Sequence, residues 1–170
     1  RTPLNRLLAG HAGTDLYHAV SCPLYQRLCG RGSYQGKGIY DPAALLAATS
    51  GWILPDTVLS HDLLEGELAG CAADSSLTLL EGQPAVWSAW LRRLHRWTRG
   101  DWQLLRWLLP WVQTPAGVRR NPLSRFSRHK VWDALRLSLL PLGHAALLLC
   151  SALSARPGLF LLTLALMLAE

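Results

Sequence analysis

The sequence predicts a mostly helical α/β chain that ends in membrane helices. Apolar residues recur at helical spacing through much of residues 1–115, and a short apolar segment between turn-forming residues, 75–80, is typical of a strand. A run of about nineteen mostly apolar residues, 137–155, approaches the length of a bilayer span. We therefore expect a folded domain at 1–115, a basic juxtamembrane segment at 116–136 and transmembrane helices at 137–170, the second of them truncated.

Composition narrows the class of protein. The chain has 170 residues, which is long enough for one modest core. It contains eight tryptophans and has a formal net charge of +6. Its four cysteines lack C-x-x-C pairing and metal-ligand spacing, so we expect neither a zinc site nor a disulfide framework. No nucleic-acid motif is present, and a phosphorylated ligand and anionic lipid explain the charge better than a nucleic acid partner does. Since the sequence lacks an initial Met and stops inside an apolar run, we expect a fragment of a longer protein.

The first third of the sequence predicts helix, then loop. Residues 1–29 have helical apolar spacing, with breaks at Gly10, Gly13 and Pro23. Residues 30–38 contain four glycines, and the third comes one residue too late for a dinucleotide-binding fingerprint. A loop with a short strand that lines a sugar site is expected, with Tyr34 or Tyr40 able to stack on a pyranose ring. A plain glycine-rich turn is the alternative.

Two short helices should follow. Asp41 as N-cap and Pro42 at the first helical position predict a helix that ends at Ser50-Gly51. Ser60 can cap a second helix that runs to about Ala73, with His61, Asp62 and Glu65 within one turn. A carboxylate near a helix N-terminus is favourable for structural reasons alone, so Asp62 has both a structural and a catalytic explanation.

A helix from about Pro84 should carry the main binding chemistry. An apolar stripe is expected to face a core and consists of Trp87, Trp90, Leu91, Leu94 and Thr98. Arg92, Arg96 and Arg99 share another face, where guanidinium groups suit a diphosphate because each can donate two hydrogen bonds to phosphate oxygens. A solvated basic face is the alternative.

The last third indicates a membrane. Residues 104–111, rich in leucine and tryptophan, suit a helix in the bilayer interface. A basic collar precedes the apolar run and comprises Arg119, Arg120, Arg125, Arg128 and Lys130. By the positive-inside rule this collar faces the cytoplasm. A buried helical hairpin of a soluble protein is the alternative.

Three strings of the sequence resemble one family. Arg93 and the pair Arg96-Trp97 are similar to the Q/R-x-x-R-W motif of processive, membrane-bound β-glycosyltransferases. The longer string H-R-W-T-R-G-D-W-Q resembles the cyclic β-1,2-glucan synthases in particular, as do G-S-Y-Q-G-K-G-I-Y-D at 32–41 and L-S-H-D-L-L-E-G at 59–66. The strings occur in the family's order. The resemblance implies the C-terminal part of a glycosyltransferase domain with a GT-A-like fold.

The resemblance also implies roles for individual residues. Asp62 would be the general base that takes the proton of the acceptor hydroxyl. The donor diphosphate would be bound by Arg93, Arg96 and Arg99. The acceptor sugar would be bound by Trp97, Tyr34, Gly36 and Lys37. Supporting positions would be His61, Glu65, His95, Asp101 and Gln103.

The implied reaction is the inverting transfer of glucose from UDP-glucose to a growing β-glucan at a bacterial inner membrane, with the catalytic part in the cytoplasm. Membrane lipids are further partners. A β-1,2 linkage rests on the resemblance alone, and neither product length nor ring closure is indicated. A divalent cation, Mg²⁺ or Mn²⁺, is expected on a D-x-D motif that the family places upstream and that this sequence lacks. No metal ligands are therefore assigned within it.

Two other functions stay open. A glycoside hydrolase could use Asp62 with Glu65 or Asp101 as its carboxylate pair, although it would need neither phosphate-binding arginines nor a membrane span. A non-catalytic membrane anchor would use the arginines only for lipid headgroups. Binding of UDP would separate the transferase from both.

Overall fold

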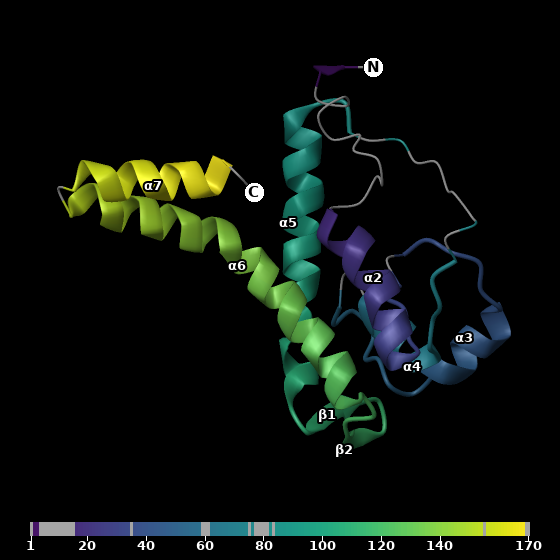
Figure 1. Cartoon of the computed structure of the whole chain (residues 1–170). Helices are drawn as coiled ribbons and strands as arrows, with labels where there is room; N and C mark the ends of the chain where they lie inside the picture. Colours follow the sequence, from purple (N-terminus) through teal and green to yellow (C-terminus); the bar gives the residue numbers. More distant parts are fainter. Residues whose placement is uncertain are drawn as a thin grey trace. The chain divides into compact units, whose positions relative to one another are not determined.

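The computed structural model describes residues 2–3, 16–34, 36–58, 62–74, 76, 82, 84–154 and 156–168. These residues are mostly helical, with a two-stranded antiparallel sheet (Figure 1). The chain divides into two compact units, residues 1–132 and residues 133–170. The prediction of a mostly helical chain is confirmed.

The first helix with described bounds is α2 (Leu16–Cys29), which continues through Pro23. The predicted break there is wrong, because a proline removes one backbone hydrogen bond and need not end a helix. α3 (Pro42–Thr49) has the predicted start, since Asp41 Oδ1 accepts hydrogen bonds from the backbone N–H groups of Ala43 at 2.8 Å and Ala44 at 3.3 Å.

Between α2 and α3, residues 31–34 and 36–41 form a loop, without the expected short strand in the part described. α4 (Asp62–Ala69) then has Asp62 in its first turn, as predicted. Gly70, at φ +79°, follows it directly, so the helix ends before Ala73. Apart from Ser76, the predicted strand at 75–80 lies outside the described residues, as do Ser60, His61 and the predicted breaks at Gly10 and Gly13.

α5 (Trp87–Gln103) is the predicted arginine helix, and it begins three residues after Pro84. Its apolar stripe does not face a core: Trp87 is 57%, Leu91 56% and Leu94 44% exposed, while Trp90 and Thr98 are half-buried. That prediction is wrong, because helical spacing places residues on one face but does not supply the layer that would cover them.

The 3₁₀ helix η1 (Leu104–Leu108) and the hairpin of β1 (Trp111–Thr114) and β2 (Gly117–Arg120) follow α5. Asn121 joins them, because its Nδ2 donates to the backbone carbonyls of Trp107 at 2.6 Å and Leu109 at 2.8 Å. The predicted helix at 104–111 is therefore too long, since η1 ends at Leu108 and Trp111 belongs to β1. Side chains three residues apart lie on one side of a 3₁₀ helix, so Leu104 and Trp107 are both buried, whereas Leu105 is 47% exposed.

The core of the first unit lies where α4, η1, β1 and the start of α6 (Arg125–Leu153) meet. Its buried side chains are Leu64, Leu104, Trp107, Val112, Leu123 and Val131. Leu64 is completely buried and so fixes the rotation of α4, which leaves Asp62 half-buried at the edge of the core. Packing in the core thus orients the helix that carries the predicted base.

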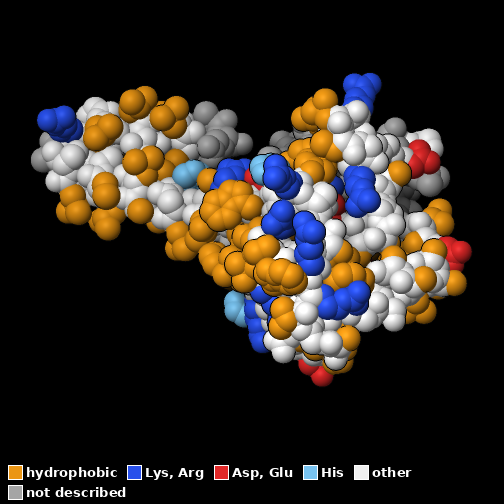
Figure 2. All heavy atoms as spheres, turned by 90° about the horizontal axis from the view of Figure 1, so that it is seen from below, with side chains coloured by type: hydrophobic (Ala, Val, Ile, Leu, Met, Phe, Trp, Pro, Cys, Tyr) orange, Lys and Arg blue, Asp and Glu red, His pale blue; other side chains and the backbone are white. Residues whose placement is uncertain are grey.

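α6 is long and apolar enough to cross a membrane, by length and composition, and α7 (Pro157–Leu168) is a shorter apolar helix. Figure 2 shows Lys and Arg side chains gathered beside exposed hydrophobic side chains on the face formed by the hairpin and the start of α6. Trp111 and Val118 of the hairpin are 59% and 70% exposed. One part of the predicted collar is corrected, since Lys130 is buried, 5% exposed, and cannot face a lipid surface.

Candidate active site

The loop of residues 31–41 packs directly against the N-terminal end of α4. Gly36 has φ +76°, and a Cβ added to it would lie 2.5 Å from Asp62 Oδ2 and 2.9 Å from Asp62 Cγ. Only glycine combines that backbone angle with so close an approach. Two of the three strings predicted to carry function, 32–41 and 59–66, thus meet at the contact between Gly36 and Asp62.

Tyr34 fills the space next to that contact. A Cβ on Gly66 would overlap the Cβ of Tyr34, and one on Gly38 would lie 3.4 Å from the Tyr34 ring. Because Gly66 follows Asp62 by four residues, the two share one face of α4. The face of α4 opposite to the core therefore carries Asp62 at one end and receives Tyr34 one turn later.

The surroundings of Tyr34 disfavour ionisation of its phenol. Burial raises the pKa of Tyr34 above its ordinary value, the Asp62 carboxylate adds to the rise, and Tyr40, Glu65 and Cys71 contribute further. A protonated phenol donates one hydrogen bond and accepts others, as a sugar hydroxyl does. The pair of Tyr34 and Asp62 therefore offers both a donor and an acceptor on one small surface.

The arginines of α5 form a second group. An open hollow of about 680 Å³ is lined by Gly82, Pro84, Ala89, Arg92, Arg93 and Arg96. The guanidinium of Arg93 lies over the Trp97 ring, 5.6 Å from its centroid, and Trp97 in turn meets Trp90 edge to face at 6.1 Å. The aromatic pair restrains Arg93, so its charge is held at the helix surface.

The remaining predicted residues lie around these two groups. Arg99 is exposed on α5 and is not among the described residues that line the hollow. Lys37 and His95 are exposed, and Glu65, Asp101 and Gln103 are half-buried. The structure therefore joins Tyr34 and Gly36 to Asp62, and joins Arg93 to Arg96 and Trp97, as two groups built from different elements.

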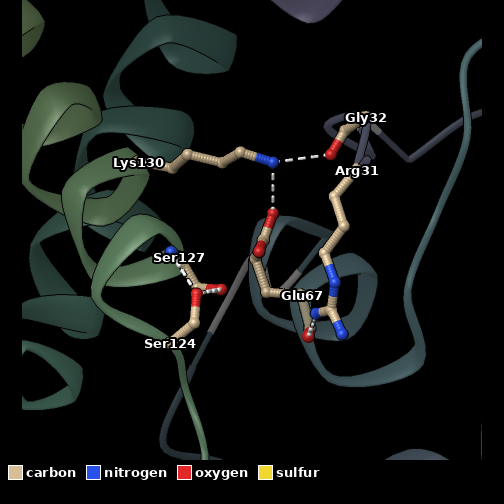
Figure 3. A network of polar contacts seen from close by, with 6 residues as sticks. All are labelled: Arg31, Gly32, Glu67, Ser124, Ser127 and Lys130. Carbon is tan, nitrogen blue, oxygen red and sulfur yellow. Dashed lines mark hydrogen bonds and ion pairs between the residues drawn. The ribbon is translucent and has the colours of Figure 1, made fainter. Parts of the chain in front are cut away.

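A buried ion pair beside the first group was not predicted. Lys130 Nζ donates to Glu67 Oε1 at 2.6 Å and to the backbone carbonyl of Gly32 at 2.6 Å (Figure 3). Lys130 was assigned to the basic collar because its neighbours in the sequence are basic. The acid that pairs with it lies 63 residues away, and a single sequence contains no signal for such a distant pairing.

The described residues do not fit a metal centre. Among them, no three His, Cys, Asp or Glu side chains form a group that could hold a metal ion. Hard divalent cations are held by clustered oxygen ligands, which this part of the chain does not assemble.

The chain was compared with known protein families and with individual proteins. No protein-family model matches the chain. The chain is 40% identical over 141 residues, 83% of its length, to the protein named cyclic beta-(1,2)-glucan synthase NdvB from Rhizobium meliloti (strain 1021). This chain is similar to a cyclic β-1,2-glucan synthase. The resemblance found in the three strings is thereby confirmed.

The aligned part covers 5% of the length of that synthase. Residues 32–41, 59–66 and 95–103 together account for a small share of the 141 aligned residues, so the similarity extends well beyond the three strings. The activity of that synthase is a property of a much longer protein.

Proposed function

We propose that this chain is part of a membrane-bound glucosyltransferase that transfers glucose from UDP-glucose to a growing β-glucan, with β-1,2 linkage. The observation that carries the proposal is the packing of Gly36 against the Asp62 carboxylate. It places the candidate base beside a loop that also holds Tyr34. The similarity to a cyclic β-1,2-glucan synthase supports glucan synthesis as the overall activity.

In the proposed reaction an acceptor hydroxyl oxygen attacks the anomeric carbon of the donor glucose. The bond from that carbon to the diphosphate oxygen breaks, UDP leaves with the bonding electron pair, and the configuration at the carbon inverts. Asp62 accepts the hydroxyl proton as the new bond forms, because a sugar hydroxyl is too weak an acid to attack unaided. Tyr34 would orient the acceptor by donating a hydrogen bond.

The departing diphosphate needs positive charge. Arg93 and Arg96 line one hollow, and planar guanidinium groups can donate pairs of hydrogen bonds to phosphate oxygens. Stabilising charge as it develops is commonly the largest single contribution to such a transfer. Trp97, which holds Arg93, is 41% exposed and can stack on an acceptor sugar. Arg99 would assist from the next turn of α5.

The fold and the cofactor are proposed from the family resemblance. The fold would be GT-A-like, and the described residues would contribute mainly helices and a two-stranded sheet to it. A divalent cation bound to donor phosphates remains a proposal from the family resemblance, with ligands elsewhere than in the residues described. No step above depends on it.

A location at the cytoplasmic side of an inner membrane completes the proposal. α6 is long and apolar enough to span a bilayer, and Arg119, Arg120 and Arg125 before the apolar part are exposed. Exposed cations of this kind are attracted to anionic lipid headgroups. Membrane lipids would thus be partners of the same surface that Figure 2 shows.

Replacement of Asp62 by asparagine tests the proposal directly. Asn keeps the size of the side chain and its capping ability but cannot accept the proton. In the full-length protein, Asp62→Asn should leave expression and UDP-glucose binding intact and lower glucosyl transfer at least about a hundredfold, the low end for loss of a general base. Transfer is measured as incorporation of labelled glucose into membrane-bound glucan.

Glu65→Gln is the matched control, since Glu65 lies in the same turn of α4 and is also half-buried. It should affect transfer much less. Near-normal turnover of the Asp62→Asn variant would make Asp62 a structural residue at a helix N-terminus. Loss of glucan hydrolysis, with no dependence on UDP-glucose, would favour the hydrolase instead.

A further inference from the structure

Lys130 is a charged residue that the proposed transfer does not use, yet it is buried next to the Asp62 site. Its side chain is 3% exposed and that of its partner Glu67 is 1% exposed. Charged groups are seldom buried this far unless they are paired and hydrogen-bonded. Figure 3 shows the Lys130 side chain reaching from α6 to both Glu67 and Gly32.

The contacts of Lys130 reach both halves of the site. Glu67 belongs to α4, the helix that begins with Asp62, and Gly32 belongs to the loop that carries Gly36. The loop and the end of α4 are also tied directly, since the Gly32 N–H donates to the Cys71 carbonyl at 2.9 Å and Arg31 Nη1 donates to the Glu67 carbonyl at 3.1 Å. Lys130 adds the link from this pair of segments to α6.

The surroundings of the Lys130 ammonium group make Lys130 and Glu67 depend on each other. The rings of Phe126 and Tyr25 lie 4.8 Å and 5.6 Å from Lys130 Nζ, so much of its surroundings is aromatic. Oε2 of Glu67 is buried with no hydrogen-bond partner among the described residues. Neutralisation of the Glu67 carboxylate therefore depends on Lys130, and a change at either residue is felt at the other.

We infer that Lys130 is a positioning residue: it holds the loop of residues 31–41 and α4 on α6, and thereby holds Gly36 against Asp62. The role in transfer rests on the proposed function of Asp62, whereas the structural link does not. α6 continues into the candidate membrane span, so Lys130 connects the Asp62 site to the helix by which the protein would be anchored.

Hydrogen exchange on the full-length protein in its membrane tests the link without any assay of activity. In Lys130→Met, the backbone amides of residues 31–41 and 62–69 should exchange at least about tenfold faster than in the wild type, because the segments open locally more often. Amides of the β1–β2 hairpin should be unaffected. His129→Met is the matched control, since His129 adjoins Lys130 on the same helix but is exposed, and it should change neither segment.

A double variant separates positioning from mere stability. Lys130→Met with Glu67→Met removes both buried charges, so it should recover much of the thermal stability that either single variant loses. The Gly32 carbonyl still lacks its donor. We therefore expect fast exchange at 31–41 and glucosyl transfer about tenfold below wild type to persist, since a small displacement of a reacting group is costly.

The outcomes are distinct. Unchanged exchange in Lys130→Met, or full recovery of both slow exchange and transfer in the double variant, overturns the inference. If Lys130→Met fails to fold, the double variant gives the same decision. If the exchange pattern is as expected but the wild-type protein makes no glucan from UDP-glucose, the link stands and the proposed function fails.

Discussion

The Asp62 site and the arginine face of α5 differ in how tightly their residues are packed. At the first, three segments are locked together: a glycine lies against the carboxylate, a tyrosine fits on a second glycine, and a buried ion pair ties both to α6. At the second, the charges stand around an open hollow, and Leu91 and Leu94 of the same helix are exposed. The side chains of the Asp62 site are thus held in place by packing, whereas those of the α5 face share a charge and a location but few fixed contacts.

This difference has a functional consequence. Groups that take part in proton transfer must be placed accurately, because the transfer occurs only within hydrogen-bond reach. Cations that stabilise a diphosphate act over longer distances and tolerate looser placement. We therefore expect the Asp62 site to be sensitive to small steric changes and the α5 face to be sensitive mainly to loss of charge.

Among changes that leave the catalytic and charged side chains in place, the largest effect should come from Gly36→Ala. The new Cβ would lie 2.5 Å from Asp62 Oδ2, so the loop or the carboxylate must move. Glucosyl transfer should fall at least about tenfold, as expected when a catalytic group is displaced. Stability should fall as well, by about 1–2 kcal/mol for a left-handed backbone angle. Both are measured on the full-length protein.

Gly51→Ala is its control. Gly51 has nearly the same backbone angle, φ +75°, but an added Cβ meets nothing within 4 Å. It should show the loss of stability without the loss of transfer. Equal effects of the two substitutions on transfer would mean that the contact between Gly36 and Asp62 has no catalytic importance.

The next effect concerns the charge on α5. Arg96→Ala should weaken UDP binding about tenfold or more, since a hydrogen bond to a charged group contributes about 1.5–3 kcal/mol. Arg99→Ala should do less, because Arg99 does not line the hollow in the part of the chain described. Isothermal titration with UDP measures both.

Trp97→Ala completes the test of that face. Trp97 is 41% exposed, so its loss should leave the protein folded and should impair use of the glucan acceptor more than UDP binding. The reverse pattern, with UDP affinity lost only in the tryptophan variant, would exchange the roles assigned to Arg96 and Trp97.

A smaller effect is expected at the surface proposed to face lipid, which is formed by the hairpin and the start of α6. Arg120→Gln with Arg125→Gln removes two exposed charges, each contributing about 1 kcal/mol near an anionic surface. In nanodiscs, anionic lipid should slow amide exchange in the hairpin relative to neutral lipid, and the double variant should lose most of that protection. Added salt should have the same effect in the wild type. If amide exchange in the hairpin responded neither to the double variant nor to added salt, a lipid-facing role would be excluded.

What the sequence could predict follows from the range of the interactions involved. The cap at Asp41, the helical start at Asp62 and the helix of arginines depend on residues within a few positions of one another. Each was correct in kind. The Q/R-x-x-R-W and glycine strings likewise contain their own signal, and the similarity of the chain to a glucan synthase confirms the resemblance that they indicated.

What the sequence could not predict depends on distant segments. The exposure of the apolar stripe on α5, the burial of Leu104 and Trp107, and the pairing of Lys130 with Glu67 are each decided by which elements come to lie together. Local composition was misleading at Lys130, whose basic neighbours in the sequence suggested exposure, and at residues 104–111, where leucine and tryptophan suggested one continuous helix. Local composition does not reveal tertiary partners.

The smallest effect should be a dependence of stability on alkaline pH at Tyr34. Burial, followed by the Asp62 carboxylate, raises the pKa of Tyr34 in the folded state. Between the unfolded value of about 10 and that higher pKa, the folded chain therefore holds a proton that the unfolded chain has lost. The contribution to stability is present in full below pH 10 or so and is lost as the pH rises through the folded pKa.

Tyr34→Phe removes this titration, so the free energy of unfolding of the variant should change differently from that of the wild type in this alkaline range. The difference between wild-type and Tyr34→Phe tyrosinate absorbance gives the pKa of Tyr34 itself. In Asp62→Asn that pKa should move back toward its ordinary value, because a neighbouring negative charge is gone, but not all the way, because burial remains. No movement at all would mean that Tyr34 and the Asp62 carboxylate do not face each other, and the two-residue surface proposed for the acceptor would be lost.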